Sequence, residues 1–311
     1  MAQITRAQAA ALLSEVEASE IIKPQHYQSI ALKHFHVSSM AAGAESVPVL
    51  NTMPLAGFVT NTGVATDNKP ASSMAWVNKE FRPEEIACIV PIHENTLADS
   101  NFDIEGEISQ AVTSALGIVL DKAVLFGVGK PASWLSPALI PGAIAAGNTV
   151  TATNDVLADF NTALGRVEDN NFYPNRALTG ISYKQKLRGV TGESSKFITL
   201  GDITRPDEDP TLVYGVPTEF MGAGGGSLVW DKTVAEALVG DFNTARLAIR
   251  EDFRVKVLDQ ATIDYGDQQI NLAQRDMVAF RFTFRVAYAT LFSTAAGVDT
   301  DFPFAVIQPS A

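Results

Sequence analysis

The stretch from Asp99 to Gly129 constrains the fold most, because it carries the longest clean helical pattern in the chain. Its apolar residues recur three or four positions apart, which predicts one buried stripe and one solvated side. The predicted stripe contains Ile104, Ile108, Val112, Ala115, Val119, Ala123 and Phe126. The predicted solvated side contains Glu107, Gln110, Ser114, Gly117 and Asp121.

Both ends of this helix carry recognisable signals. Ser100 or Asp103 can cap its start, and Gly127 followed by Pro131 stops it. About 24 residues at ~1.5 Å each give a strut of roughly 36 Å. Within the predicted stripe, Ala115→Asp is expected to break the packing, because it places an unpaired carboxylate on the apolar seam.

Size and charge limit the functional classes. With 311 residues and 46% hydrophobic content, the chain can form a sizeable core and two lobes. A net charge of −12 argues against a dedicated nucleic-acid-binding surface. The sequence contains no run of about 18 apolar residues, and its start is acidic and amphipathic, so we expect neither a membrane span nor a signal peptide. The single cysteine, Cys88, is expected to be a buried small hydrophobe.

The first part of the chain reads as an arm followed by a hairpin. Residues 1–20 predict a helix, and residues 24–49 lose regular spacing, as expected of an arm that lies across another surface. The polar stretch 59–75 lies between strand-like flanks, the second being 76–92, with Ile86, Cys88, Val90 and Ile92 on one face. This arrangement predicts a long projecting hairpin.

The strongest strand pattern covers residues 277–291. Val278, Phe280, Phe282, Phe284, Val286 and Tyr288 are predicted to point one way, and Arg281, Thr283 and Arg285 the other. Its length matches that of the strut helix, so we expect the two to pack side by side. One lobe is then discontinuous, and a second lobe is inserted between its halves.

The inserted lobe has mixed helix and strand patterns. Asn154 or Asp155 caps a predicted helix that ends near residue 170, and residues 176–190 predict a strand and then a helix. The glycines at 222 and 224–226 indicate a flexible loop. Residues 241–259 are read as two short strands.

A search for catalytic, cofactor-binding or metal-ligating residues identifies none. The segment GVGKPAS at Gly127 lacks the first glycine of a phosphate-binding loop and is read as a helix stop. His34 and His36 lack a third ligand at a useful spacing and are read as solvated. The acid pairs Glu84–Glu85 and Asp207–Asp209 are read as surface, and a ligand contact for the loop at Gly222 is the weaker of two interpretations. These patterns suggest no reaction.

Three segments, taken in order, resemble the major capsid proteins of tailed bacteriophages with the HK97 fold. They are FRPEEIACIVPIHENTLADS; TLVYGVPTEFM followed by VGDFNTARLAIREDFRVKV; and QRDMVAFRFTFRVAYATLFSTAAGVDTDFPFAVIQ. The resemblance extends from about residue 56 to 308. It implies an α+β fold with an N-terminal arm at 1–50 and an extended loop at 57–91. It also implies a peripheral domain of 92–130 plus 268–311, with 102–126 as spine helix, and an axial domain of 131–267.

The resemblance also implies function and partners. It implies a structural, non-enzymatic subunit without cofactors, whose copies form hexamers and pentamers of an icosahedral shell around double-stranded DNA. The shell belongs to the virion and is assembled in the cytoplasm of the host bacterium, without a membrane. A separate scaffolding protein, a portal and decoration proteins are further implied partners, and packaged DNA is expected to be contacted only weakly.

Two departures from the family pattern qualify this picture. About 50 residues precede the loop, so we expect any scaffold to be a separate chain or residues 1–20 to perform a reduced version of that role. Lys69 or Lys79 can supply an amine for a crosslink, but Asp276 and Thr283 stand where the family has asparagine and glutamate, so self-crosslinking is not expected.

Three alternatives remain open from the sequence. An encapsulin shell would co-purify with protein cargo rather than DNA. A soluble enzyme with a site in the inserted lobe would elute as a monomer or dimer with a bound small molecule. Another virion structural protein would form tubes or fibres.

Overall fold

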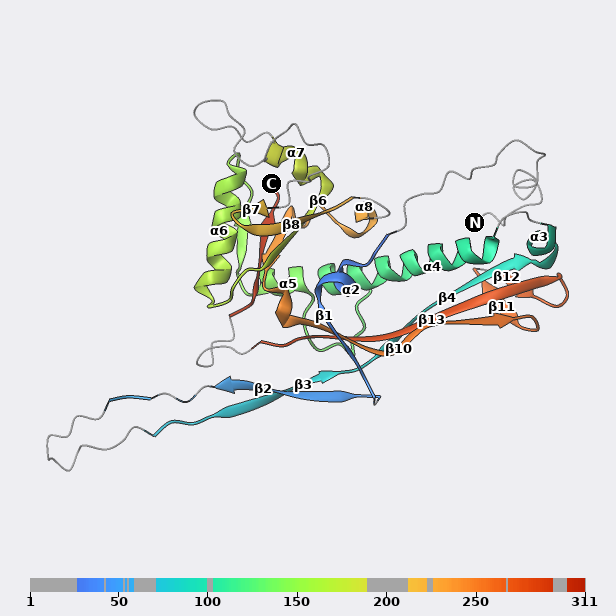
Figure 1. Ribbon diagram of the computed structural model, residues 1–311, viewed down its shortest axis with the longest axis horizontal. Coiled ribbons are helices and arrows are strands. Elements are labelled where there is room, and N and C mark those ends of the chain that lie inside the picture. The colour runs from blue at the N-terminus through green and yellow to red at the C-terminus, as the bar shows by residue number, and fades with distance from the viewer. Residues whose placement is uncertain are drawn as a thin grey trace.

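Two β-sheets and one long helix organise the chain (Figure 1). The computed structural model describes residues 27–41, 43–52, 54, 56–58, 71–99, 103–188, 212–222, 226–266, 268–292 and 301–310. The expected helix over 1–20, the tip of the polar loop, and Asp207–Asp209 lie outside these residues. The expectations for them stay predictions.

The four-stranded sheet has the order β1-β10-β13-β4. Its members are β1 (His36–Ser39), β10 (Ala245–Leu258), β13 (Met277–Thr290) and β4 (Glu84–His93). β1 runs parallel to β10, and the other pairs are antiparallel. The predicted alternation of β13 is confirmed, because Phe280, Phe282 and Phe284 are buried whereas Arg281 is exposed.

The expected division of 241–259 into two short strands is wrong, since β10 is one continuous strand. Its pairing with β13 shifts register between Ile249 and Glu251 and again between Glu251 and Arg254. Each shift is a bulge that resets which face a side chain occupies. These bulges explain why the alternation of apolar and polar residues is interrupted in this part of the sequence.

The strut helix comprises α4 (Ile104–Asp121) and a final π-helical turn, η1 (Lys122–Phe126). The Asp103 side chain accepts a hydrogen bond from the Gly106 N–H at 3.0 Å, and Gly127 ends the helix with φ 74°. Both signals therefore have the predicted roles.

The predicted buried stripe of this helix is partly wrong. Ala115 and Val119 are exposed, whereas Gly117 and Asp121 are fully or almost fully buried. Leu116 and Leu120 pack in the same core as the phenylalanines of β13, and the N-terminal arm covers the side that carries Gly117 and Asp121. The C-terminal half of α4 is therefore enclosed from two directions, which a single stripe does not describe.

The helix from Ile104 to Phe126 is also long and apolar enough to cross a membrane by length and composition alone. Here it packs on the sheet, and its buried Asp121 is hydrogen-bonded to the arm. It is the core helix of this lobe.

The second sheet has six strands in the order β5-β14-β9-β6-β8-β7. They are β5 (Thr149–Thr151), β14 (Phe304–Gln308), β9 (Ala237–Gly240), β6 (Arg176–Gly180), β8 (Val216–Met221) and β7 (Leu212–Val213). The predicted helix α6 (Val156–Asp169) begins at Asp155, whose side chain accepts from the Ala158 N–H. It packs with α7 (Ile181–Arg188) in a second core, and α5 (Leu139–Ala145) contributes to the first.

The two sheets cut across the expected lobe boundaries. β10, expected within 131–267, pairs with β13 in the four-stranded sheet, and β14, expected with 268–311, lies between β5 and β9 in the six-stranded sheet. A boundary read along the chain misses this because strand pairing joins segments far apart in sequence.

The expected second flank of the hairpin, residues 76–92, is divided between two strands. β2 (Glu45–Thr52) pairs only with β3 (Ala75–Phe81), and they project away from both sheets (Figure 1). Arg82 and Pro83 separate β3 from β4, which belongs to the four-stranded sheet. The face of β4 that carries Ile86, Cys88, Val90 and Ile92 packs on the core, as predicted.

The remaining elements are short. They are α2 (Ile30–His34), α3 (Glu94–Asp99), α8 (Gly226–Val229), η3 (Phe242–Thr244), and the ribbon of β11 (Thr262–Tyr265) and β12 (Gln268–Asn271). The expectation of an arm without regular structure over 24–49 is wrong where it can be compared, because α2, β1 and part of β2 lie there.

Candidate functional site: the arm contact and the projecting hairpin

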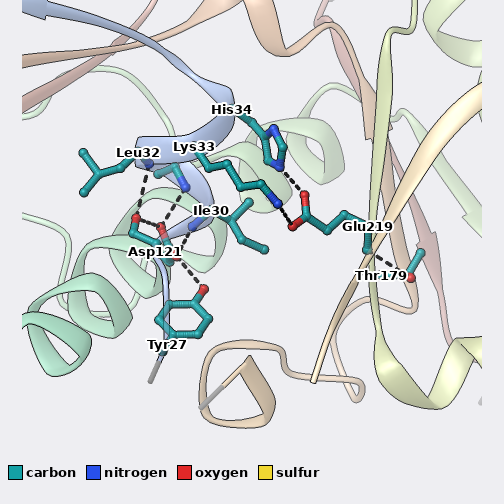
Figure 2. A network of polar contacts seen from close by, with 10 residues as sticks. Tyr27, Ile30, Leu32, Lys33, His34, Asp121, Thr179 and Glu219 are labelled. Atoms are coloured by element: carbon teal, nitrogen blue, oxygen red, sulfur yellow. Dashed lines mark hydrogen bonds and ion pairs between the residues drawn. The ribbon is translucent and has the colours of Figure 1, made fainter. Parts of the chain in front are cut away.

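A buried carboxylate fixes the arm to the strut helix (Figure 2). Asp121 is fully buried and accepts hydrogen bonds from the Tyr27 hydroxyl at 2.5 Å and the Ser29 hydroxyl at 2.8 Å. It also accepts from the backbone N–H groups of Ile30 at 2.8 Å and Ala31 at 3.0 Å. Two of these donors are the unpaired N–H groups at the start of α2, so Asp121 acts as a cap supplied by another helix.

The protonation of this cluster follows from its burial. Burial raises the pKa of Asp121, and the hydrogen bonds from Tyr27, Ser29 and the backbone oppose that rise. Burial, and then the charge of Asp121, raise the pKa of the Tyr27 hydroxyl. The phenol therefore stays protonated and remains a donor.

A glycine makes room for the arm on the same side of the helix. A Cβ at Gly117 would lie 3.3 Å from the Cβ of Ser29, a tight approach that requires Ser29 to move. Gly117 and Asp121 are four residues apart and share one face. Gly117 provides space for the arm, and the Asp121 carboxylate provides its hydrogen-bond acceptors. We call these two residues the seat of the arm.

A second contact joins the arm to the six-stranded sheet. Glu219 on β8 accepts a hydrogen bond from Lys33 Nζ at 2.6 Å and pairs with His34 Nε2 (Figure 2). Burial acts to raise the pKa of Glu219, but the hydrogen bonds and charges of His34 and Lys33 outweigh it and lower the pKa to about 2. The arm thus connects both lobes within one subunit.

The hairpin, by contrast, leaves apolar surface uncovered. Trp76 is 59% exposed, Met74 51% and Val77 42%. A two-stranded sheet with so little burial is only marginally stable by itself. Because consecutive strand residues point to opposite faces, Trp76 and Val77 leave apolar side chains uncovered on both faces of the hairpin, where a neighbouring chain can bury them.

The residues considered for chemistry from the sequence do not form a common site. His34 is not solvated as expected, since its side chain is 7% exposed and pairs with Glu219. Lys130 donates to the carbonyls of Trp134 and Ser136, which fixes the turn after the helix stop, and burial lowers its pKa. Within the described ranges, no group of three or more His, Cys, Asp or Glu residues could hold a metal ion.

The crosslinking residues are also dispersed. Lys79 Nζ lies 5.7 Å above the ring of Phe292, just beyond the end of β13, whereas Asp276 precedes its start. β13 spans roughly 45 Å at ~3.3 Å per residue, so a single subunit does not bring Lys79 and Asp276 together. Lys69 lies outside the described residues, and the absence of crosslinks stays a prediction.

Sequence reasoning missed the most constrained residues. Asp121 and Gly117 were assigned to the solvated side because their residue types are common there, and Glu219 carried no motif. A usable signal existed in the pair itself, because a glycine and an aspartate four apart in the interior of a long apolar helix both weaken an isolated helix.

The body of the subunit is held together by buried contacts, whereas the hairpin leaves apolar side chains available for association with another chain. The model of the phage capsid family matches residues 12–296, and the chain therefore belongs to the phage capsid family. It is a structural major capsid protein, and its place is the capsid of the virion.

Solved structures agree with this assignment. A chain from Microbacterium phage Oxtober96 is 49% identical with a TM-score of 0.85, covering 99% of this chain and 100% of that chain. A chain from Mycobacterium phage Bobi is 33% identical with a TM-score of 0.81 and full coverage of both chains. The capsid of a native GTA particle, at 16% identity and a TM-score of 0.66, shares the fold. A comparison with curated proteins finds no match. The encapsulin alternative is not favoured.

Proposed function

We propose that copies of this chain assemble into a closed icosahedral shell of hexamers and pentamers that encloses the double-stranded DNA of a phage. The projecting hairpin carries this proposal, because its exposed Trp76, Met74 and Val77 have no cover within their own subunit. Burial against a neighbouring copy supplies the missing stabilisation. Many such contacts, repeated by symmetry, hold a shell together even when each is weak.

The lobes have different roles in this proposal. The lobe built on the six-stranded sheet gathers at the five-fold and six-fold axes, and the lobe built on the four-stranded sheet and α4 forms the periphery. The hairpin reaches over the adjacent subunit. Scaffolding, portal and decoration proteins are separate partners, assembly takes place in the cytoplasm of the host bacterium, and DNA is held only weakly.

The arm, expected from the sequence to lie across another surface, finds that surface within its own subunit over residues 27–40. These residues are attached through Asp121 and β1, so the hairpin, and not this part of the arm, has apolar side chains left for a neighbouring copy. Assembly therefore depends on β2 and β3 more than on this part of the arm.

Negative-stain microscopy of the purified protein tests the proposal, with closed particles as the expected result. Removing residues 63–73 at the loop tip should leave each subunit folded, judged by circular dichroism, but reduce the yield of particles. A discrete monomer with a bound small molecule, or unchanged particle yield after trimming, would contradict the proposal.

A further inference from the structure

Three cations gather on the outward face of the four-stranded sheet. Arg281 on β13 lies directly opposite Lys256 on β10, and Thr283 lies opposite Arg254, so all three charges share the face that α4 does not cover. Their residues are exposed. Facing like charges on neighbouring strands repel each other and destabilise the sheet.

Nothing in the described parts of the subunit compensates this charge at contact distance. Arg254, Lys256 and Arg281 form no ion pair with any described residue. One row further along, Arg285 differs, because Glu251 and Glu85 stand opposite it on the two flanking strands. The cluster of three is thus an uncompensated cationic surface on a chain whose net charge is −12.

The neighbouring residues favour a protein partner over a nucleic acid. Ile89 lies opposite Arg281 on β4 and is 39% exposed, and Ala87 lies opposite Thr283. Arginine beside uncovered apolar side chains is typical of protein interfaces. A DNA backbone would use the cations but leave the apolar side chains without contacts.

The same chain offers a complementary acidic surface. Between Arg82 and Lys122 the sequence contains eight Asp or Glu residues and no Lys or Arg. Glu94 in α3 and Asp103 and Glu105 at the start of α4 are exposed, and both helix starts lie at one end of the four-stranded sheet (Figure 1). We call Glu94, Asp103 and Glu105 the acidic corner.

The acidic corner does not neutralise the basic cluster of its own subunit. His93 pairs with Met277, so Glu94 follows the end of the sheet, four residues along β13 from Arg281. That separation is roughly 13 Å of strand at ~3.3 Å per residue. It exceeds the Debye length of about 8 Å at physiological salt, so the attraction between these exposed groups is largely screened.

We infer that the basic sheet face of Arg254, Lys256 and Arg281 receives the acidic corner of a second copy of this chain. The inference rests on the proposed self-assembly and adds a contact distinct from the hairpin. Because the two surfaces lie at different places on the subunit, the contact is head-to-tail. Head-to-tail contacts continue from copy to copy and close into a ring when the rotation between neighbouring copies closes, which is the arrangement that a capsomer requires.

Charge-swap variants test the contact. Lys256→Glu/Arg281→Glu reverses the sheet face, and Glu94→Lys/Glu105→Lys reverses the acidic corner. Each double variant should lower particle yield at least about tenfold, because like charges then meet. Combining all four substitutions in one chain should restore the yield. Arg166→Glu/Lys232→Glu changes the net charge by the same amount as the sheet-face variant, at exposed positions of the other lobe. It is the matched control for that variant and should assemble normally.

A second measurement does not depend on shells. Mixing the two double variants should produce association by sedimentation velocity that neither shows alone, and this association should weaken from about 0.1 M to about 1 M NaCl as the Debye length falls from about 10 to about 3 Å. If the two double variants associate when mixed but the wild type forms no particles, the contact is supported and the proposed shell is rejected.

The inference is overturned if wild-type particles form and the double variants assemble equally well. It is also overturned if neither the mixture nor the fourfold variant regains association. A different result would assign the surface to nucleic acid instead. In that case the wild type binds duplex DNA, the sheet-face variant does not, and the two double variants fail to associate when mixed.

Discussion

At the scale of single residues, the seat of the arm depends on matching one carboxylate to four donors. A buried charge is tolerated when hydrogen bonds replace the water it loses. Asp121 meets this condition only while Tyr27, Ser29 and the start of α2 remain in place. The carboxylate and the arm therefore stabilise each other.

Replacing this carboxylate should be costly. Asp121→Ala leaves four buried donors without an acceptor, and we expect a loss of about 3 kcal/mol or more in the free energy of unfolding. Urea denaturation of dissociated subunits measures it. Glu105→Ala, an exposed change in the same helix, should cost less than about 0.5 kcal/mol. Equal stability of the two variants would show that the arm is not held this way.

The Glu219 contact should depend on pH. Its pKa of about 2 lies below that of an unfolded glutamate, so its contribution is full above about pH 4.5 and disappears as the pH falls towards 2. Glu219→Gln should therefore destabilise the subunit at pH 7, by no more than about 3 kcal/mol, and by less near pH 3. Denaturation curves at both pH values measure this difference. A difference independent of pH would contradict the ion pair.

At the scale of elements, the strut helix shows what a sequence pattern can and cannot predict. Asp103 and Gly127 fix its ends through local geometry, so both were predictable. Its buried faces depend on α2 and on the sheet, which come from elsewhere in the chain. The strands followed the same division: the alternation of β13 was readable, whereas the bulges of β10 are defined only by its partner.

Two substitutions in neighbouring residues separate the real core face from the predicted one. Ala115→Asp, expected from sequence to break the packing, should change the unfolding free energy by less than about 0.5 kcal/mol, because Ala115 is exposed. Leu116→Ala should cost about 2–5 kcal/mol, because it opens a cavity beneath the helix. Thermal or urea unfolding compares them. A larger loss of unfolding free energy for Ala115→Asp than for Leu116→Ala would instead support the buried stripe predicted from the sequence.

At the scale of the whole molecule, the subunit has a well-anchored body and an uncovered hairpin. The general α+β architecture and the family resemblance could be recognised from the order of segments along the chain. The seat at Asp121 and the strand exchange between sheets could not, because both depend on residues that are distant in sequence and carry no motif.

The hairpin's apolar surface should matter for assembly and not for folding. Trp76→Asp should leave the unfolding free energy of isolated subunits nearly unchanged, since the side chain is 59% exposed. It should strongly reduce particle yield in micrographs, because it removes apolar area from a contact between copies. Trp76→Phe keeps an apolar ring and serves as the control. Normal particles from the aspartate variant would show that this side chain faces solvent in the shell.

The position of β14 has a consequence for synthesis. It lies between β5 and β9, so the six-stranded sheet lacks an interior strand until Phe304–Gln308 have been translated and have left the ribosome. β14 is the last of the described strands in chain order, so this lobe completes its sheet later than the four-stranded sheet, whose strands all precede β14.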